Sequence, residues 1–186
     1  MTIFNGDWFG DLSILECILD TIEFISGTDR RNMQRKANIK KRGKGFESMK
    51  YGLTWRSFIT KDRNRVKDEK SGKYITKCKI DYPYLDDVLK EFSSIYFSDF
   101  KWTQLQLNKS YQCPPHVDGQ NVNESILVCC GDYEGGRTCV YNHETKKITK
   151  YDAREQYVKF DGSKYLHWTE HFEGNRYAIV FYNDIK

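Results

Sequence analysis

Hydrophobic positions near the start of the chain follow the period of an α-helix in two places. Leucine and isoleucine recur three and four positions apart in residues 11–26, which predicts an amphipathic helix that ends before Gly27. The same spacing returns in residues 85–95, where the preceding Pro83 is typical of a helix start. We expect both helices to pack against one face of a sheet.

After Asp99 the pattern changes to that of strands. Residues 102–108 alternate between polar and apolar side chains, which is typical of a half-buried strand with one face toward a pocket. Strands are also expected at 51–60, 125–131, 138–142, 148–152, 157–160, 165–168 and 176–182, with a hairpin connection at 61–73 and a tight turn at 132–136. Many short strands between Gly, Asp and Asn turns predict a jelly-roll or closed double sheet.

The length of 186 residues suits one domain with a sizeable core, and the 15% of aromatic residues favours a β-rich interior. We therefore predict an α+β, mainly β fold. Its single domain, residues 1–186, would have a helical and basic part at 1–99 and a metal-binding β core at 100–186.

The net charge of +4 is unevenly distributed. Between Arg30 and Arg65, thirteen Lys or Arg residues oppose only two acids, Glu47 and Asp62. Such a run suits a surface that contacts phosphates, and it equally suits a solvated loop, so the sequence leaves both interpretations open. Within it, residues 28–50 are expected to form a mobile loop that orders on binding an anion.

The six cysteines have no spacing typical of a disulfide framework. The first residues have no basic start and no long apolar run, and no stretch approaches the roughly 18 apolar residues of a membrane span. We expect reduced, mostly buried thiols in a cytoplasmic or otherwise intracellular protein, the nucleus included, without membrane association.

His116 and Asp118 are two residues apart, so on an extended backbone their side chains leave the same face and can bind one ion. A third ligand is expected far downstream, where His167 and His171 are the candidates. Two imidazoles and one carboxylate form the facial triad of non-haem Fe(II) oxygenases. Nine residues after His167, Arg176 could hold a carboxylate through its rigid fork, which indicates a dicarboxylate co-substrate.

Other interpretations of these residues are weaker. Cys113 and His116 offer a thiolate and an imidazole, which suit zinc, but a second pair at similar spacing does not exist. The glycines of residues 131–136 are not a phosphate loop, because no Lys-Ser or Lys-Thr follows them. His143 is expected to be exposed at the tip of a hairpin.

His116-x-Asp118, then Gly131-Asp-Tyr-Glu-Gly-Gly136, then a distal His with an Arg nine residues later resemble the Fe(II)/2-oxoglutarate-dependent dioxygenases. The likeness is closest to the TET/JBP-like branch and its small viral and microbial relatives, and it covers about residues 100–183. It implies a double-stranded β-helix in which His116, Asp118 and His167 bind iron and Arg176 binds 2-oxoglutarate. It also implies a contact of Asn108 with 2-oxoglutarate, although Asn108 equally suits a turn.

Two positions depart from the family pattern. His171 stands where a proline is usual, and Ala178 stands where a small hydroxyl residue often follows the arginine. The resemblance implies an enzyme that uses Fe(II), 2-oxoglutarate and O2 to hydroxylate a C–H bond. Tyr165 and Trp168, on either side of His167, are candidates for the pocket wall.

The favoured substrate is a base of DNA or RNA, such as the methyl group of a modified pyrimidine. The distal motif, the basic segment and the abundant aromatic residues that could stack a flipped base all favour it. Two alternatives stay open: a prolyl or lysyl hydroxylase of proteins with the same iron centre, and a non-catalytic binding module on this barrel. The binding module is favoured by the two departures from the pattern.

Overall fold

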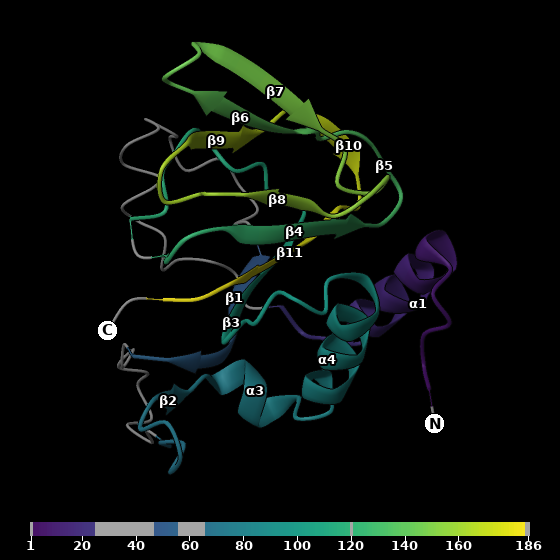
Figure 1. Cartoon of the computed structure of the whole chain (residues 1–186). Helices are drawn as coiled ribbons and strands as arrows, with labels where there is room; N and C mark the ends of the chain where they lie inside the picture. Colours follow the sequence, from purple (N-terminus) through teal and green to yellow (C-terminus); the bar gives the residue numbers. More distant parts are fainter. Residues whose placement is uncertain (1, 25–46, 56–65, 120, 185–186) are drawn as a thin grey trace.

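The structure is a computed structural model, and it describes residues 2–24, 47–55, 66–119 and 121–184. Three helices lie on one side of a set of antiparallel strands (Figure 1). The helices are α1 (Trp8–Asp20), α3 (Lys77–Asp81) and α4 (Leu85–Tyr96). The strands are β1 (Glu47–Thr54), β2 (Tyr74–Ile75), β3 (Gln104–Lys109), β4 (Ser125–Cys130), β5 (Tyr133–Gly135), β6 (Thr138–Asn142), β7 (Lys147–Tyr151), β8 (Val158–Phe160), β9 (Leu166–Thr169), β10 (Phe172–Gly174) and β11 (Tyr177–Tyr182).

The described strands form three sheets. The largest has six strands in the order β2-β1-β3-β11-β4-β8, a second has the order β7-β6-β9, and β10 pairs with β5 alone. Every pairing is antiparallel, and β11, the last strand in sequence, lies between β3 and β4. The prediction of a mainly β jelly-roll with N-terminal helices against one sheet is confirmed. β1, from the N-terminal half, pairs with β3, so both halves of the chain contribute to the largest sheet.

The central strands are buried on both faces, and alternate residues pack into different hydrophobic clusters. In β4, Val128 and Cys130 belong to the core shared with the helices, whereas Leu127 and Cys129 belong to a second cluster on the opposite face. A strand buried on both sides has an unbroken apolar sequence because neither face meets water. The adjacent cysteines therefore face opposite sides of the sheet, as predicted, and all six cysteines are free thiols.

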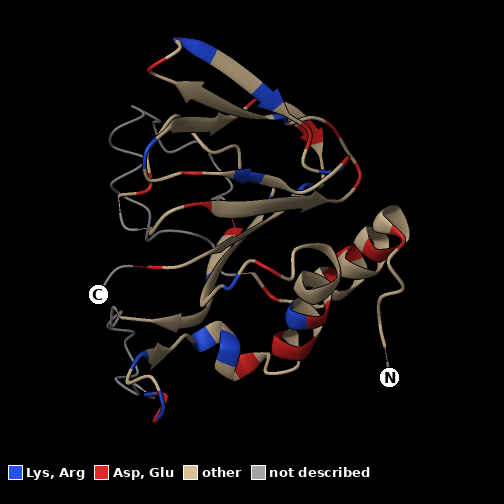
Figure 2. Cartoon of the chain, in the orientation of Figure 1, with Lys and Arg blue, Asp and Glu red and all other residues tan. Residues whose placement is uncertain are grey.

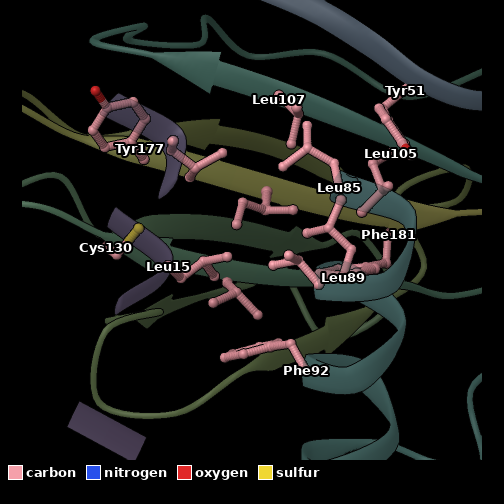
Figure 3. Packing of buried hydrophobic residues seen from close by; sticks show 14 of the residues in the cluster. Leu15, Tyr51, Leu85, Leu89, Phe92, Leu105, Leu107, Cys130, Tyr177 and Phe181 are labelled. Atoms are coloured by element: carbon pink, nitrogen blue, oxygen red, sulfur yellow. The ribbon is translucent and has the colours of Figure 1, made fainter. Parts of the chain in front are cut away.

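The helix-side core explains why the N-terminal helices form. Leu15 of α1 and Leu89 and Phe92 of α4 are completely or almost completely buried against Leu105 and Phe181 of the sheet (Figure 3). Burying such side chains stabilises the fold by roughly 1.5–3 kcal/mol each. Short helices are marginal on their own, so this packing is what holds α1 and α4 in place.

The first helix is shorter than predicted. It runs from Trp8 to Asp20, whereas the spacing predicted residues 11–26. The backbone N–H and the hydroxyl of Thr21 both donate to the carbonyl of Ile18, at 3.2 and 2.7 Å, which closes the last turn. Ile22 is nevertheless buried, so its place in the apolar pattern reflects the core and not the helix. The predicted stop at Gly27 lies outside the described residues.

The prediction of a tight turn at 132–136 is wrong. Residues Tyr133–Gly135 form β5, which pairs with β10, an element that the sequence pattern did not predict. The two strands come so close at Gly174 that a side chain there would overlap the carbonyl oxygen of Asp132. Three-residue strands rich in glycine have too little periodicity to be recognised in a sequence.

The basic front of the chain falls mainly outside the described residues. Of the expected strand at 51–60, β1 contains the first part and begins earlier, at Glu47, so residues 47–50 belong to a strand and not to a loop. Residues 25–46 and 56–65, which carry most of the positive charge between Arg30 and Arg65, are not described. In the part of the chain that is described, no helix is long and apolar enough to cross a membrane.

Replacing Leu89 by alanine should lower the free energy of unfolding by about 2–5 kcal/mol, because Leu89 is fully buried and its loss leaves a cavity. Ile95→Ala is a matched control on the same helix, since Ile95 is 41% exposed and its truncation should cost about 0.5 kcal/mol or less. Urea denaturation of both variants measures the difference. Equal losses would contradict the assignment of this helix face to the core.

Candidate metal centre

A cavity of about 750 Å³ opens between the two larger sheets. The six-stranded sheet contributes Asn108 and Ala178 to its wall, and the three-stranded sheet contributes Thr138 and His167. Arg176, immediately before β11, also lines it. The alternation predicted for residues 102–108 is confirmed at these positions, because Gln106 and Asn108 line the cavity while Leu105 and Leu107 lie in the helix-side core.

Three side chains meet in this cavity as a candidate metal site. His116, Asp118 and His167 each place a ligand atom within 4.8 Å of the other two, and the described residues contain no second group of this kind. The carboxylate of Asp118 is close to both imidazoles, with Oδ1 3.3 Å from Nε2 of His116 and Oδ2 3.6 Å from Nε2 of His167. Two nitrogens and one oxygen on one side of a shared space are the donor set of a facial triad.

Backbone hydrogen bonds bring these three residues together. His116 and His167 exchange a reciprocal pair of N–H to carbonyl bonds, both 3.0 Å long, although they are 51 positions apart. The N–H of Asp118 donates to the carbonyl of Gly162 at 2.8 Å. The segment after β3 is therefore held to β9 at His116 and to the loop before β9 at Asp118.

Both imidazoles are held in the orientation that metal binding needs. Nδ1 of His116 is 2.9 Å from the carbonyl of Pro114, and Nδ1 of His167 is 2.9 Å from the carbonyl of Tyr165. A carbonyl oxygen can only accept, so Nδ1 carries a proton in each ring, and Nε2 is the nitrogen that faces Asp118. Hydrogen bonds of this kind orient metal-binding histidines and raise their basicity.

The two imidazoles of the triad have pKa values shifted in opposite directions. Burial opposes the charged form of His116, but the Asp118 carboxylate and the Cys113 thiol raise the pKa of His116 to about 10. Burial and the neighbouring His116 charge lower the pKa of His167.

Two neighbours shape the space around the triad. The amide of Asn121 donates to Oδ2 of Asp118 at 3.1 Å and so fixes the plane of the carboxylate. At Gly162, an added Cβ would lie 3.0 Å from the Asp118 carboxylate and 3.3 Å from the His167 ring, so a side chain there would press on two of the three candidate ligands. Neither residue could be recognised from the sequence, because both contacts depend on how the loops fold back.

Arg176 lies in the same cavity and has unused hydrogen-bonding capacity. It is only 3% exposed, its Nη2 donates to the sulfur of Cys129 at 3.1 Å, and its buried Nε has no hydrogen-bond partner. The rings of Tyr133 and Phe172 lie 5.5 and 5.6 Å from the guanidinium carbon, and the described residues provide no acid in ion-pair contact. A buried cation without an anion is costly, so this position suits an anionic ligand.

Asn108 lies within β3, so the interpretation as a turn residue is wrong. Its Oδ1 accepts from the hydroxyl of Ser48 at 2.8 Å, and that hydroxyl accepts in turn from Nε2 of Gln106 at 2.8 Å. Nε2 of Gln106 also donates to the carbonyl of Met49, which fixes the direction of the whole chain of bonds. The NH2 group of Asn108 is thereby left as a donor on the cavity wall.

The remaining candidates lie elsewhere. The side chain of His171, the rival for the third ligand, is 77% exposed beside Glu173, so that alternative is wrong. His143 is exposed on the β6–β7 hairpin, as predicted. Trp168 lines the cavity as expected, whereas Tyr165 packs against His143 instead.

The zinc alternative gains no support. Cys113 lines the cavity and its sulfur is 3.5 Å from Nδ1 of His116, the nitrogen that already bonds to Pro114. Among the described residues the thiol does not join the group whose ligand atoms all lie within 4.8 Å of one another. Two imidazoles and one carboxylate therefore form the candidate metal site, and the Cys113 thiol contacts only the His116 ring.

Comparison with known proteins identifies the fold. The sequence matches no protein-family model and no curated protein. Among solved structures, a 2OG-Fe(II) oxygenase family protein from Burkholderia pseudomallei is similar over 92% of this chain and 76% of its own, with a TM-score of 0.52 and 10% identity. A Pseudomonas putida prolyl-4-hydroxylase matches over 100% and 90%, with a TM-score of 0.51 and 10% identity. NgTET1 in complex with 5mC DNA matches over 92% and 68%, with a TM-score of 0.50 and 12% identity. The chain thus has the double-stranded β-helix fold of these oxygenases.

His167→Ala should lower the affinity for Co(II), a stable substitute for Fe(II), by more than about 100-fold, since loss of a mere supporting residue already costs 10–100-fold. His171→Ala is the matched control and should leave the affinity unchanged, because its side chain is 77% exposed outside the cavity. Titration monitored by the visible absorption of Co(II) measures both. A loss of binding in His171→Ala with retention in His167→Ala would reverse the ligand assignment.

Proposed function

We propose that the chain is an Fe(II)/2-oxoglutarate-dependent oxygenase that hydroxylates a C–H bond. One observation carries this proposal: a facial triad with both Nε2 atoms directed at Asp118 shares a cavity with Arg176, a buried arginine that has no anionic partner among the described residues. The triad suits Fe(II), and the arginine suits the distal carboxylate of 2-oxoglutarate. The residues thus fit both the metal and the co-substrate.

When bound, iron and 2-oxoglutarate supply the oxidising chemistry, in which O2 converts 2-oxoglutarate to succinate and carbon dioxide while the substrate is hydroxylated. His116, Asp118 and His167 would hold the metal. Arg176 binds and orients the distal carboxylate, and the NH2 group of Asn108 donates to the same co-substrate. The low exposure of His167 and Arg176, 7% and 3%, keeps bulk water away from these contacts.

The substrate that we propose is a base of DNA or RNA. Trp168 on the cavity wall offers a ring on which a flipped base can stack, and Lys50 on the same wall offers a positive charge near its phosphate. The volume of about 750 Å³ accommodates 2-oxoglutarate and a planar ring together. The net charge of +4 and the similarity in fold to NgTET1, a protein seen with 5mC DNA, also favour this class.

A protein side chain is the second candidate substrate. The similarity to the Pseudomonas putida prolyl-4-hydroxylase extends over 100% of this chain, and Trp168 could equally stack on a proline ring. The same iron centre would serve both reactions, so the recognition of the substrate distinguishes them. A non-catalytic barrel, the third alternative, corresponds to a protein that binds neither iron nor 2-oxoglutarate.

Adding 2-oxoglutarate to the Fe(II)-loaded protein without oxygen should produce the weak visible charge-transfer band of the chelate. Arg176→Met should raise the dissociation constant for 2-oxoglutarate about 10- to 150-fold, because charge-assisted hydrogen bonds contribute roughly 1.5–3 kcal/mol. Its affinity for Co(II) should not change, since Arg176 is not a ligand. A folded wild-type protein that binds Co(II) but gives no band would refute the proposed co-substrate.

Nucleic acid should stimulate the formation of succinate from 2-oxoglutarate, and the stimulation should fall steeply between 50 and 200 mM salt, because contacts with phosphates release counterions. Trp168→Ala should reduce this stimulation at least ~5-fold, from the roughly 1–3 kcal/mol of one stacked base. Tyr165→Ala is the matched control, since this nearby aromatic residue does not line the cavity. Stimulation by proline- or lysine-containing peptides, and not by DNA or RNA, would favour the protein hydroxylase instead.

A further inference from the structure

The β6–β7 hairpin is exposed and rich in positive charge. β7 is an edge strand of the three-stranded sheet, and its residues 147–150 are all exposed, as is Lys146 in the turn before it. Figure 2 shows the blue of Lys147 and Lys150 toward the two ends of β7. Among the residues that the structure describes, neither Lys146 nor Lys147 has an acid within ion-pair distance.

The charges around the hairpin leave an excess of positive charge. Lys150 and Arg137 share the carboxylate of Glu170, with Nζ of Lys150 2.6 Å from Oε1 and Nε of Arg137 2.8 Å from Oε2. Lys164, in the loop before β9, is paired with Glu144 of the turn at 2.8 Å. With the two unpaired lysines of the hairpin, this group has five cations and two acids. Lysines that merely oppose strand pairing would be confined to the edge strand, whereas here the charge continues on both sides of it.

Two other parts of the described surface would repel a polyanion. α1 carries no Lys or Arg, and burial together with the nearby Asp20 and Asp132 raises the pKa of the Glu16 carboxyl. On the β5–β10 pair, Glu134 and Glu173 lie directly opposite each other and both are exposed. Figure 2 shows these acidic stretches in red on α1 and β10. Because charge of one sign attracts ligands of the other, the β6–β7 hairpin is the better place for an anionic partner.

The register of the three-stranded sheet places the hairpin beside the cavity. Thr149 of β7 is opposite Val140 of β6, and Val140 is opposite the metal-site residue His167 of β9. Neighbouring strands lie about 4.8 Å apart, so the backbone of β7 is roughly 10 Å from that of His167. Lys147 and Lys150 are about 10 Å apart along the strand, and one strand of a nucleic acid carries a charge about every 3.4 Å, so the two lysines can contact different phosphates.

We propose that the β6–β7 hairpin contacts the phosphate backbone of the nucleic acid whose base enters the cavity. This inference rests on the proposed function and names the surface that holds the substrate outside the cavity. Lys147 and Lys150 lie on alternate faces of an edge strand, so their charge surrounds the edge and suits a rod-shaped polyanion. Contacts with phosphates position a nucleic acid but do not read its sequence. The hairpin therefore supplies affinity and placement, and the cavity selects the base.

The test is the double variant Lys146→Gln/Lys147→Gln, compared with the wild type in titrations of a fluorescent DNA duplex at several salt concentrations. The slope of the logarithm of the binding constant against that of the salt concentration should become shallower by about 1.8, because each lost phosphate contact removes about 0.9. At about 100 mM salt the dissociation constant should rise at least 10-fold, and to a similar extent for duplexes of different sequence. The affinities for Co(II) and 2-oxoglutarate should not change, since both lysines are exposed outside the cavity.

The matched control is the double variant Lys70→Gln/Lys101→Gln. It removes the same charge from exposed positions before β2 and before β3, so the salt slope and the dissociation constant should stay close to those of the wild type. Equal losses in the two double variants would overturn the inference, because the net charge and not the hairpin would then govern binding. The proposed function would stand in that case.

Two further outcomes would also overturn the inference. A wild type that binds poly-glutamate in preference to DNA or RNA, and loses this binding in the hairpin variant, would favour an acidic protein as the partner of the hairpin. A wild type that binds Co(II) and 2-oxoglutarate but neither DNA nor RNA would overturn the proposed substrate class itself. The second result is seen in the wild type alone, so the two failures are distinguishable.

Discussion

The reciprocal backbone hydrogen bonds between His116 and His167 are the constraint on which the site depends. They fasten the turn that follows β3 to β9 of the other sheet, at the two residues whose imidazoles must share one ion. Side-chain rotamers alone could not achieve this, because a shift of either segment by one residue would turn its side chain to the opposite face. The grouping of the three candidate ligands is therefore a consequence of backbone pairing.

The six-stranded sheet has the main hydrophobic core on one face and the cavity with the candidate ligands on the other. Tyr177, Ile179 and Phe181 of β11 face the helices and build the larger core, while Ala178 and Val180 face the cavity. The helices supply enough apolar packing on one side for the other side to contain buried polar groups that lack partners. Figure 2 shows that α1 carries acidic residues and no Lys or Arg. Lys50 and Arg176, in contrast, line the cavity.

Much of this arrangement could be predicted from the sequence, and the reason is physical. The prediction that His116 and Asp118 bind one ion used the period of two of an extended backbone, and the two side chains do meet in one site. The double burial of β4 appears in the sequence as an unbroken apolar run. The contacts that complete the site could not be predicted in the same way. Gly162 and Asn121 matter because loops return them to Asp118, and local periodicity contains no information about where a loop returns. The end of α1 was misjudged because Ile22 is buried without being helical.

The two departures from the family pattern, His171 and Ala178, lie in different surroundings in the structure, because only Ala178 lines the cavity. His171 stands on the exposed side of the β5–β10 pair, so its presence in place of a proline does not alter the cavity. Ala178 faces the cavity and leaves a real gap in the polar wall around Arg176. A binding site requires a donor at a point in space and not at a point in the sequence, so a residue on the opposite sheet can fill such a gap. In a double-stranded β-helix two sheets enclose one ligand cavity. A donor on one sheet can therefore take the place of a donor that is missing on the other sheet without a change in the backbone.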